Sequence, residues 1–520
     1  MNFIPHSSKR SSVFRQWLRW SRKRACLVPV MAALSFALAC TTGKTETTSS
    51  GTSSQPASAA GFSTSSLKGN YVYRLAGNYF NLQSGDGPYE RAGTFIADGN
   101  GNITSGVDDF VQSSAPSSNP IVGNYAISSD GTGKLTINLG NSQLIFAITM
   151  VADGTVYLIE FDTTATGAGV AVLQDASAFQ PPTGTFAFRF HSNQANIPSQ
   201  GSVSRVGTMA VTSKGSVAGS EDIVRVNALS SLTLTGSLSA PDSTGKGTAI
   251  FSDSAGFTLN YFYYVIDSNT LTFLETDEGP LGDGRAEMQT GAPFSDSSLS
   301  NVFVFHSLGE TETTLDGVNS VGALHSDGKG NVTLGSYDSV QDGVPTVNAS
   351  LSGTYSIDSS GRAVIDLTPQ GSTTIEFIAW MVSPSRAFFL VNVAGLAEDG
   401  AMDQQQTITA GSLNGQYSIL MYGHDQQTPP LVDRVGVITL NGSSVITLTD
   451  YFINRNGSRN QISTDPVGTY NLGANGRLSA SITGVTSAMV LYMTSNNSGY
   501  LILEDTGEDV SGSIALQVTP

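Results

Sequence analysis

The stretch that decides the fold is GNYAISSDGTGKLTINLGNSQLIFAITMVADGTVYLIEFD, residues 123–162. Short runs rich in β-branched and aromatic residues alternate here with turn sequences such as Asp130-Gly131 and Asp153-Gly154. Runs of this length between Asp-Gly pairs are typical of antiparallel strands joined by tight turns. The stretch therefore predicts strands near 121–128, 133–139, 143–151 and 154–162, and a further strand follows near 169–174.

The same unit recurs four times along the chain, which is the strongest signal in the sequence. A glycine opens a strand at spacings of 113, 117 and 115 residues, in Gly123, Gly236, Gly353 and Gly468. Each repeat closes with Gly, four residues, then Gln, in the pairs Gly169 and Gln174, Gly284 and Gln289, Gly400 and Gln405, Gly512 and Gln517. A third marker is an acidic or amide residue near a strand end, at Glu160, Glu275, Asn392 and Glu504.

Each repeat opens with an alternating, mostly aromatic strand, at 71–75, 186–190, 302–305 and 417–421. About eight short strands fit into each repeat, and no segment shows a helical period of useful length. We expect an all-β chain of four tandem antiparallel β-barrels of about eight strands each, because closure removes exposed strand edges. β-Sandwiches are the alternative, and a propeller is a weaker third.

The first 39 residues read as an export signal. Seven basic residues and no acidic ones precede an apolar run from Leu27 to Ala39. That run is too short to cross a bilayer core as a helix but suits a secretory signal. Ala37 and Ala39 supply the small residues that a signal peptidase requires, and cleavage there would release a soluble secreted or periplasmic protein.

The sequence Leu34-Ser35-Phe36-Ala37-Leu38-Ala39-Cys40 resembles the lipobox of bacterial lipoproteins. It departs from the usual pattern at Ala37, where the family has Leu. The resemblance implies that Cys40 becomes the first mature residue, carries acyl chains and anchors the protein in the membrane. Thr41 after the Cys implies the outer membrane or cell surface. Cys26 leaves with the leader, so no disulfide can form in the mature chain.

The segment after Cys40 is a tether. Residues 41–66 contain 15 Ser or Thr among 26 residues and cannot bury a core. The expected organisation is a signal peptide 1–39, a lipidated Cys and tether 40–66, and β repeats 67–178, 179–294, 295–408 and 409–520.

The repeats themselves carry a second resemblance. Their aromatic opening strand, Asp-Gly-x-Gly-Asn turn, Gly-Thr-Tyr strand and closing Gly-x4-Gln are similar to repeats in uncharacterised bacterial lipoproteins with calycin-like β-barrels. The resemblance spans about 67–520. It implies a fold and an address but transfers no activity to any residue.

Charge limits the partners. The chain has a formal net charge of -17, and its first 39 residues hold seven of its 25 basic residues. The mature chain is therefore still more acidic, which disfavours nucleic acid and anionic lipid surfaces as partners. Apart from the lipid anchor in the membrane, a protein, glycan or small-molecule ligand stays open.

Two motifs could have bound a metal, and we favour a structural role for each. Asp98-Gly99-Asn100-Gly101-Asn102 resembles the start of a calcium loop, but Ile103 and the matching Asp327-Gly328-Lys329-Gly330-Asn331 favour hairpin turns. His191 and His306 lie 115 residues apart at matching strand ends, one per repeat, and zinc needs several ligands together. We expect hydrogen-bonded histidines, no metal and no cofactor.

The remaining candidates also have structural interpretations. Glu160, Glu275 and Glu504 could serve as acids or bases, but a common strand end or a hydrogen bond to the closing Gln explains them equally well. Trp380 lies in a core-like run. In Tyr261-Phe262-Tyr263-Tyr264, alternation sends two rings away from the barrel core, to a domain contact or a ligand surface.

No catalytic residue can be assigned, so the sequence predicts a cell-envelope lipoprotein with a structural or binding role and not an enzyme. Two alternatives remain. One is a carrier of small apolar ligands inside the barrels. The other is an enzyme of unknown class in one diverged repeat, for which repeat four is the best candidate because it lacks the Asp-Gly-x-Gly turn.

Overall fold

The computed structural model describes residues 61–518, except 81–86, 113–114, 141, 194–201, 226–227, 279, 312–316, 426–430 and 486. Cys40, the predicted signal peptide and most of the predicted tether lie outside the described residues. Within the described part, no helix is both long enough and apolar enough to span a membrane.

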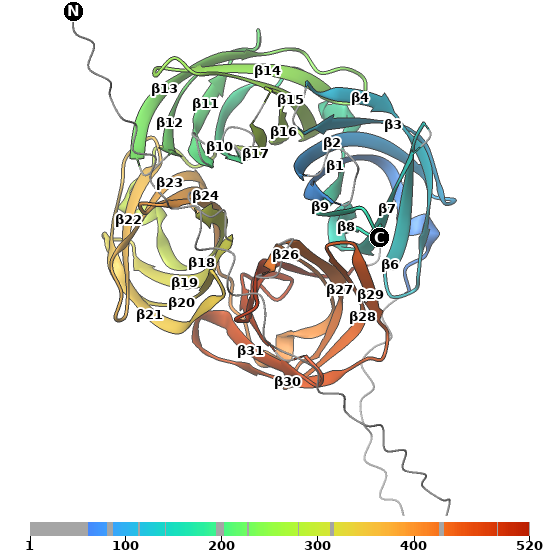
Figure 1. Cartoon of the computed structure of the whole chain (residues 1–520). Coiled ribbons are helices and arrows are strands. Elements are labelled where there is room, and N and C mark those ends of the chain that lie inside the picture. Colours follow the sequence, from blue (N-terminus) through green and yellow to red (C-terminus); the bar gives the residue numbers. More distant parts are fainter. Residues whose placement is uncertain are drawn as a thin grey trace, which may run out of the picture. The chain divides into compact units, whose positions relative to one another are not determined.

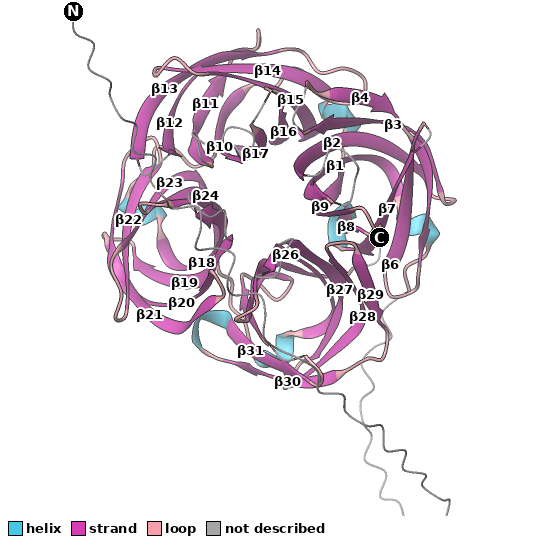
Figure 2. Cartoon of the chain, in the orientation of Figure 1, coloured by secondary structure: helices cyan, strands magenta, loops and turns pink. Residues whose placement is uncertain are grey.

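The predicted fold class is confirmed: the chain forms four closed antiparallel β-barrels of eight strands each (Figures 1 and 2). In barrels 1 and 4 the fourth strand is split in two, which adds one short strand to the sheet. The only helical elements described are 3-10 turns of three residues (Figure 2).

Barrels 1 and 2 occupy the first half of the described chain. Barrel 1 consists of η1 (Thr64–Ser66), β1 (Lys68–Tyr79), β2 (Gly87–Asp98), β3 (Asn102–Val111), β4 (Ser117–Pro120), β5 (Val122–Ile127), β6 (Thr132–Leu139), β7 (Ser142–Met150), η2 (Ala152–Gly154), β8 (Thr155–Glu160) and β9 (Ala165–Leu173). Barrel 2 consists of η3 (Ala176–Ala178), β10 (Gly184–Asn193), β11 (Val203–Val211), β12 (Ser216–Arg225), β13 (Ala228–Leu238), β14 (Lys246–Asp253), β15 (Thr258–Asp267), β16 (Thr270–Glu275) and β17 (Leu281–Met288).

Barrels 3 and 4 repeat the same order. Barrel 3 consists of η4 (Asp296–Ser298), β18 (Ser300–Thr311), β19 (Gly317–Asp327), β20 (Asn331–Gln341), β21 (Val344–Ile357), β22 (Arg362–Pro369), β23 (Ile375–Ser383), β24 (Arg386–Asn392) and β25 (Leu396–Gln404). Barrel 4 consists of η5 (Ala410–Ser412), β26 (Asn414–Asp425), β27 (Leu431–Asn441), β28 (Val445–Arg455), β29 (Ser458–Ile462), β30 (Val467–Leu472), η6 (Ala474–Gly476), β31 (Arg477–Ile482), β32 (Ala488–Met493), β33 (Ser498–Glu504) and β34 (Glu508–Leu516).

Each barrel is filled by its own apolar side chains. The opening strand of each barrel contributes alternate residues to this core, such as Tyr71, Tyr73 and Leu75 in barrel 1. The alternation follows from the two-residue period of a strand, which sends the intervening side chains out of the barrel. Barrel 1 also buries Phe62 in its core, so residues 61–66, predicted as tether, belong to the barrel at their described end.

The Asp-Gly-x-Gly motif is a hairpin turn, as predicted. The Asp98 carboxylate accepts hydrogen bonds from the backbone amides of Asn100 and Asn102, at 2.7 and 3.0 Å, and from the Asn102 side chain. Gly99 and Gly101 have φ values of 79° and 98°, which glycine adopts without strain. Asp327 makes the matching bonds in barrel 3. The turn itself therefore uses the carboxylate oxygens that a calcium ion would need.

The barrels contact one another in sequence order, and barrel 4 contacts barrel 1. Four mixed apolar clusters lie at these interfaces. They include Val72 with Tyr264 (barrels 1 and 2), Val206 with Trp380 (2 and 3), Val321 with Tyr492 (3 and 4), and Val435 with Tyr157 (4 and 1). Trp380 is therefore buried, but outside its own barrel and not in the barrel core that its sequence indicated. Tyr264 likewise makes the predicted domain contact, while Tyr261 and Tyr263 lie in the core of barrel 2.

The closing Gln of each repeat links its barrel to the next. Its side-chain amide donates to a backbone carbonyl of the following barrel: Gln174 to Val265 (2.6 Å), Gln289 to Met381 (2.8 Å), Gln405 to Met493 (2.7 Å) and Gln517 to Met150 (3.2 Å). The four acceptors are equivalent positions, so the cycle of interfaces closes with the bond from barrel 4 to barrel 1. The side-chain amide of this Gln therefore bonds the next barrel and not a glutamate of its own repeat, which was one of the two structural explanations for Glu160, Glu275 and Glu504.

Candidate functional site

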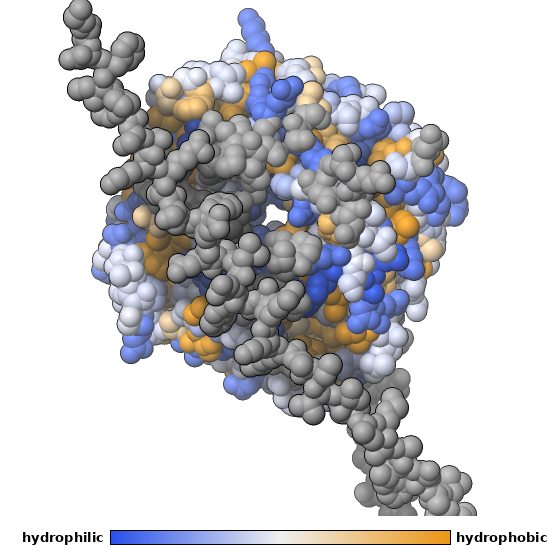
Figure 3. All heavy atoms as spheres, in the orientation of Figure 1, coloured by the Kyte–Doolittle hydropathy of each residue, from blue (hydrophilic) through white to orange (hydrophobic). Residues whose placement is uncertain are grey.

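A cavity of about 400 Å³ lies where the four barrels meet, and all four contribute to its wall. We call it the central cavity. The space-filling view shows a hollow at this place (Figure 3). Its lining comes mainly from the first strand of each barrel, β1, β10, β18 and β26. Because the side chains that alternate with the barrel core point outward, these strands present their second face to the cavity.

The pairing of the first and last strands defines equivalent positions around this cavity. In each barrel one residue of the opening strand pairs with the closing Gly. The residue just before it in the sequence is Arg74, Arg189, His306 and Leu420 in barrels 1 to 4. The residue before the closing Gly itself is Ala168, Asp283, Asp399 and Ser511. Both sets face neighbouring barrels, so one contact is repeated four times with different chemistry.

The contact between these two sets of residues differs from one pair of neighbouring barrels to the next, from an ion pair to apolar packing. Arg74 pairs with Asp283, and Arg189 pairs with Asp399 at 3.0 Å. At the equivalent position, His306 is 2.8 Å from the Ser511 hydroxyl. Leu420 and Ala168 pack together in the apolar cluster between barrels 4 and 1. Barrels 1 to 3 therefore present polar groups beside the cavity, while the fourth contact is apolar.

His191 lines the central cavity, whereas His306 belongs to the contact just described. His191 pairs across from Asp283, the residue before Gly284, but His306 pairs with Ala401, the residue after Gly400. The two histidines are therefore not equivalent, and the predicted match was wrong because the opening strand of repeat three is shifted by two residues. Both are hydrogen-bonded, as expected.

Ser204, His191 and Asp399 meet at the cavity but do not form a catalytic relay. Asp399 lies 2.8 Å from Nδ1 of His191, and the Ser204 hydroxyl lies 3.4 Å from that same nitrogen. A relay requires the hydroxyl and the carboxylate on opposite ring nitrogens. Although burial opposes it, the hydrogen bond and charge of Asp399 raise the pKa of His191 above its ordinary value. The three residues therefore form an ion pair between His191 and Asp399, with Ser204 hydrogen-bonded to the carboxylate.

A second set of equivalent positions is polar in every barrel: Glu90, Ser204, Asn319 and Asp433. Three of these bond the next barrel. Ser204 donates to Asp399 at 3.0 Å, Asn319 donates to the backbone carbonyl of Asp509 at 2.5 Å, and Asp433 accepts from the backbone amide of Gly167. These positions therefore join neighbouring barrels, and Glu90, Asn319 and Asp433 also give the central cavity a polar lining.

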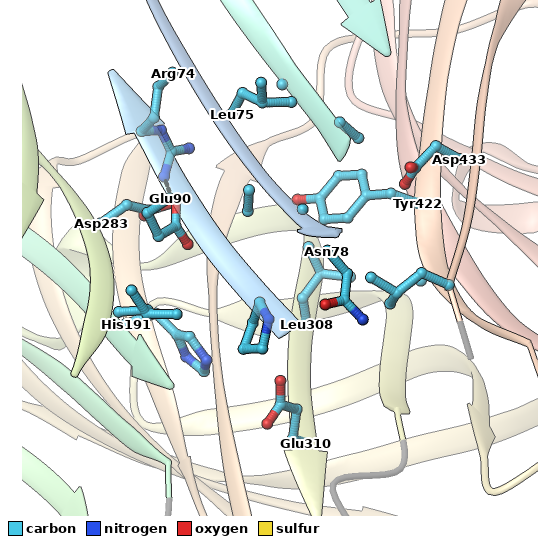
Figure 4. Close-up of a pocket in the computed structure, with 18 of the residues that line it drawn as sticks. Arg74, Leu75, Asn78, Glu90, His191, Asp283, Leu308, Glu310, Tyr422 and Asp433 are labelled. Carbon is cyan, nitrogen blue, oxygen red and sulfur yellow. Dashed lines mark ion pairs between the residues drawn. The ribbon is translucent and has the colours of Figure 1, made fainter. Parts of the chain in front are cut away.

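Three side-chain oxygen atoms in the lining of the central cavity are buried and have no hydrogen-bond partner: Oδ1 of Asn78, Oε2 of Glu90 and Oδ2 of Asp433. All three residues line the central cavity (Figure 4). Burial raises the pKa of Glu90 to about 7 and that of Asp433 to about 8. Burying an acceptor without a hydrogen bond costs free energy, so a hydrogen-bond donor from outside the protein would stabilise these three oxygens.

The acidic or amide residues near a strand end, Glu160, Glu275, Asn392 and Glu504, do not occupy one equivalent position in the four barrels. Glu160 and Glu275 pair with Phe146 and Tyr261, whereas Asn392 and Glu504 lie one residue beyond the equivalent Val391 and Leu503. A shift of one residue reverses the face of a strand. Glu160 and Glu275 are therefore buried, while Glu504 forms an ion pair with Arg477 at the side of its strand that faces Asp338.

Sequence reasoning missed the residues of the central cavity. Arg74, Glu90 and Asp433 carry no motif, and four different repeats supply the wall. The available signal was a polar residue at a position that alternates with the core residues, as Arg74 does on an opening strand and Glu90 and Asp433 do on the strands that follow, because such a position faces away from the barrel core. Among the described residues, no group of three or more His, Cys, Asp or Glu side chains is placed to hold a metal ion.

Comparison with known proteins adds no assignment. No protein-family model matches the chain, and no curated protein sequence matches it. Solved structures that match include intact Ap-TbpB with its N and C lobes, at 10% identity and a TM-score of 0.19, covering 92% of this chain and 98% of that one. Another is a Trp-176-Ala mutant of transferrin-binding protein B from Haemophilus parasuis, at 8% identity and a TM-score of 0.16, with coverage of 70% and 84%. Similarity at these TM-scores carries no argument about fold or function.

Proposed function

We propose that this chain is an exported lipoprotein of the bacterial cell envelope with a binding role, and that it binds a small, cationic molecule in the central cavity. The observation that carries the binding site is the set of three buried, unpartnered oxygens in the lining of the cavity, from Asn78, Glu90 and Asp433. Ammonium and guanidinium groups carry several donors and a positive charge, which complements two carboxyls and an amide oxygen.

The rest of the wall supports the same ligand class. Asp283 and Asp399 already have Arg74, Arg189 and His191 as partners, so Glu90 and Asp433 are the acidic groups with an oxygen to offer. Apolar residues also line the cavity, including Leu308, Leu420 and Leu431. A volume of about 400 Å³ is within the range of about 300–1,000 Å³ of small-molecule sites.

The test uses the mature full-length protein and three probes: putrescine, agmatine and the neutral polyol mannitol. At pH 9, where the Glu90 and Asp433 carboxyls are mostly ionised, we expect calorimetry to show binding of the two cations and not of mannitol. The double variant Glu90→Gln/Asp433→Asn is expected to weaken that binding by about 10- to 100-fold, since a hydrogen bond to a charged group contributes about 1.5–3 kcal/mol.

Lowering the pH provides a second readout of the same site. Because the pKa values of Glu90 and Asp433 lie near 7 and 8, protonation at pH 5 removes their negative charge, and cation binding should weaken. Glu278→Gln, at an exposed position of barrel 2, is the matched control and should leave affinity unchanged. Equal affinity in the wild type and the double variant would exclude the central cavity as the site.

The lipid anchor is tested at Cys40. We expect the wild-type protein to carry acyl chains on Cys40 and to partition with membranes, and the variant Cys40→Ser to lose both properties. Mass spectrometry of the mature N-terminus is the measurement. An unmodified Cys40 at the N-terminus of the wild-type protein would instead indicate cleavage by an ordinary signal peptidase and a soluble product.

A further inference from the structure

Barrel 3 has a cavity of its own, separate from the central cavity. It measures about 430 Å³ and opens at the end of the barrel where β18 ends and β19 begins. Its wall includes polar side chains of Ser320, Tyr337, Ser339 and Glu398, and the ring of Phe377. The equivalent interior positions of the other barrels explain why the space exists here.

Three large interior residues of barrels 1, 2 and 4 are serines in barrel 3. The first is the residue across from the closing Gly, which is Leu75, Phe190, Ser307 and Met421 in barrels 1 to 4. The second faces it on the next strand and is Arg91, Arg205, Ser320 and Arg434. The third follows on the next strand and is Phe110, Ile223, Ser339 and Ile453. Barrel 3 therefore lacks three adjacent side chains that fill the other barrels.

The second position decides the chemistry, because its arginine is neutralised inside each of the other barrels. Arg91 pairs with Asp108, Arg205 with Glu221 at 3.4 Å, and Arg434 with Glu508. These arginines are buried, with 4–7% of the side chain exposed. The barrel interior is thus built to hold a cation next to a carboxylate.

Barrel 3 has no arginine at this position, but it has a carboxylate of its own, Glu398, close by. Glu398 is 3% exposed, accepts a hydrogen bond from the Ser307 hydroxyl at 2.5 Å, and lines the cavity. It stands where the other barrels have Gly167, Gly282 and Val510. Among the described residues that line this cavity, none is Arg, Lys or His. An acidic group buried without a cation is unfavourable, as the rise of its pKa to about 7 by burial reflects.

We propose that barrel 3 binds a small amphiphilic cation, whose ammonium or guanidinium group lies beside Glu398 in the place that arginine occupies in the other barrels. The apolar body of this ligand packs against Phe377, Val391 and Leu396. An anion is repelled by Glu398. A wholly apolar molecule would cover the carboxyl and the serine hydroxyls without offering them a hydrogen bond.

The probes for this site are n-hexylamine, n-hexanol and hexanoate, measured by calorimetry at pH 8.5 on the full mature protein carrying Glu90→Gln/Asp433→Asn, so that the cation site proposed for the central cavity does not contribute. We expect hexylamine to bind, hexanol to bind about tenfold or more weaker, and hexanoate not to bind. Equal affinity for hexylamine and hexanol would overturn the charge recognition. Absence of hexylamine binding would overturn the site.

The other barrels supply the variants. Ser320→Arg introduces the arginine of barrels 1, 2 and 4 beside Glu398, and Ser307→Leu introduces the residue of barrel 1. Each is expected to abolish hexylamine binding, and Ser356→Arg, at an exposed position on β21 of the same barrel, is the matched control that should not. Retained binding in Ser320→Arg would refute the proposal.

Two further variants keep the test independent of folding and of the central cavity. Glu398→Gln preserves size and should remove the preference for hexylamine over hexanol. Glu90→Gln/Asp433→Asn should leave hexylamine binding intact, because the central cavity is a different site. Loss of hexylamine binding in that double variant would place the probe in the central cavity and overturn the assignment to barrel 3.

Discussion

Replacing Asp222 with alanine is expected to lower the free energy of unfolding by about 3–5 kcal/mol, because the change leaves a cation without its partner at the interface of barrels 2 and 3. Asp222 is fully buried and accepts both hydrogen bonds of the Arg362 guanidinium, each at 2.8 Å. It also accepts the indole N–H of Trp380 at 2.8 Å. One side chain therefore satisfies three N–H groups from two residues of the neighbouring barrel.

The measurement is equilibrium unfolding in urea, followed by near-ultraviolet circular dichroism, to which Trp380, the one tryptophan of the four repeats, contributes. Ser231→Ala is the matched control. It removes one donor to Asp222 while leaving Arg362 and Trp380 bonded, and should cost about 1 kcal/mol. The double variant Asp222→Ala/Arg362→Ala should be less destabilised than the sum of its single changes, because no orphaned charge remains. Strict additivity would show that the two residues are not coupled.

The interface recurs, so the result should extend to other barrels. Asp109 accepts from Tyr264 and Lys246 between barrels 1 and 2. Asp338 accepts from Tyr492 and Arg477 between barrels 3 and 4, at 2.5 to 2.8 Å. A buried aspartate with an aromatic donor and a cation is thus the common element of three interfaces. Its removal at Asp338 is expected to have an effect of similar size.

The second large effect is a loss of stability as the pH rises from 5 to 8. Burial raises the pKa of Glu160 to about 8 and that of Glu275 and Glu398 to about 7. Glu90 and Asp433 in the central cavity shift in the same direction. A carboxyl with a raised pKa in the folded state keeps its proton there after the unfolded chain has lost it. Stability is therefore full below the unfolded pKa and decreases as the pH rises towards the folded value.

Each such carboxyl contributes about 1.4 kcal/mol per pH unit within its window. His306 opposes the trend only at lower pH, because burial lowers its pKa to about 3 and its contribution is complete above the ordinary histidine value. The free energy of unfolding measured in urea should therefore decrease by several kcal/mol between pH 6.5 and 8. Glu160→Gln should make this dependence shallower by about 1.4 kcal/mol per pH unit, and Glu278→Gln should not. A stability that is constant or rises over this range would contradict the prediction.

Local sequence patterns were sufficient to predict the barrels. Two-residue alternation, Asp-Gly turns and the closing Gly are properties of a few neighbouring residues, and the structure has strands and turns where they predict them. The closing glycine recurs in every repeat because a larger residue would not fit between the last and first strands. A Cβ atom on Gly169 or Gly512 would lie within 1.9 Å of a backbone carbonyl of the opening strand, so glycine is required for the first and last strands to pair.

Register was the limit of the sequence approach. The matches of His306 with His191, and of Glu504 with Glu160, were each wrong by one or two residues. A shift by one residue exchanges the faces of a strand, whereas a repeat period varies by several residues. Trp380 illustrates the same limit, because an apolar run predicts burial but not whether the partner is its own barrel or the next.

The sequence by itself determined that the chain forms four all-β units, each closed by turns and built without disulfides, because those features depend on local alternation and composition. Only the tertiary structure decided that barrel 4 contacts barrel 1, that four opening strands enclose a cavity, and that serines leave barrel 3 hollow. Those features depend on which residues from different repeats lie together, and residue spacing along the chain does not specify distances across it.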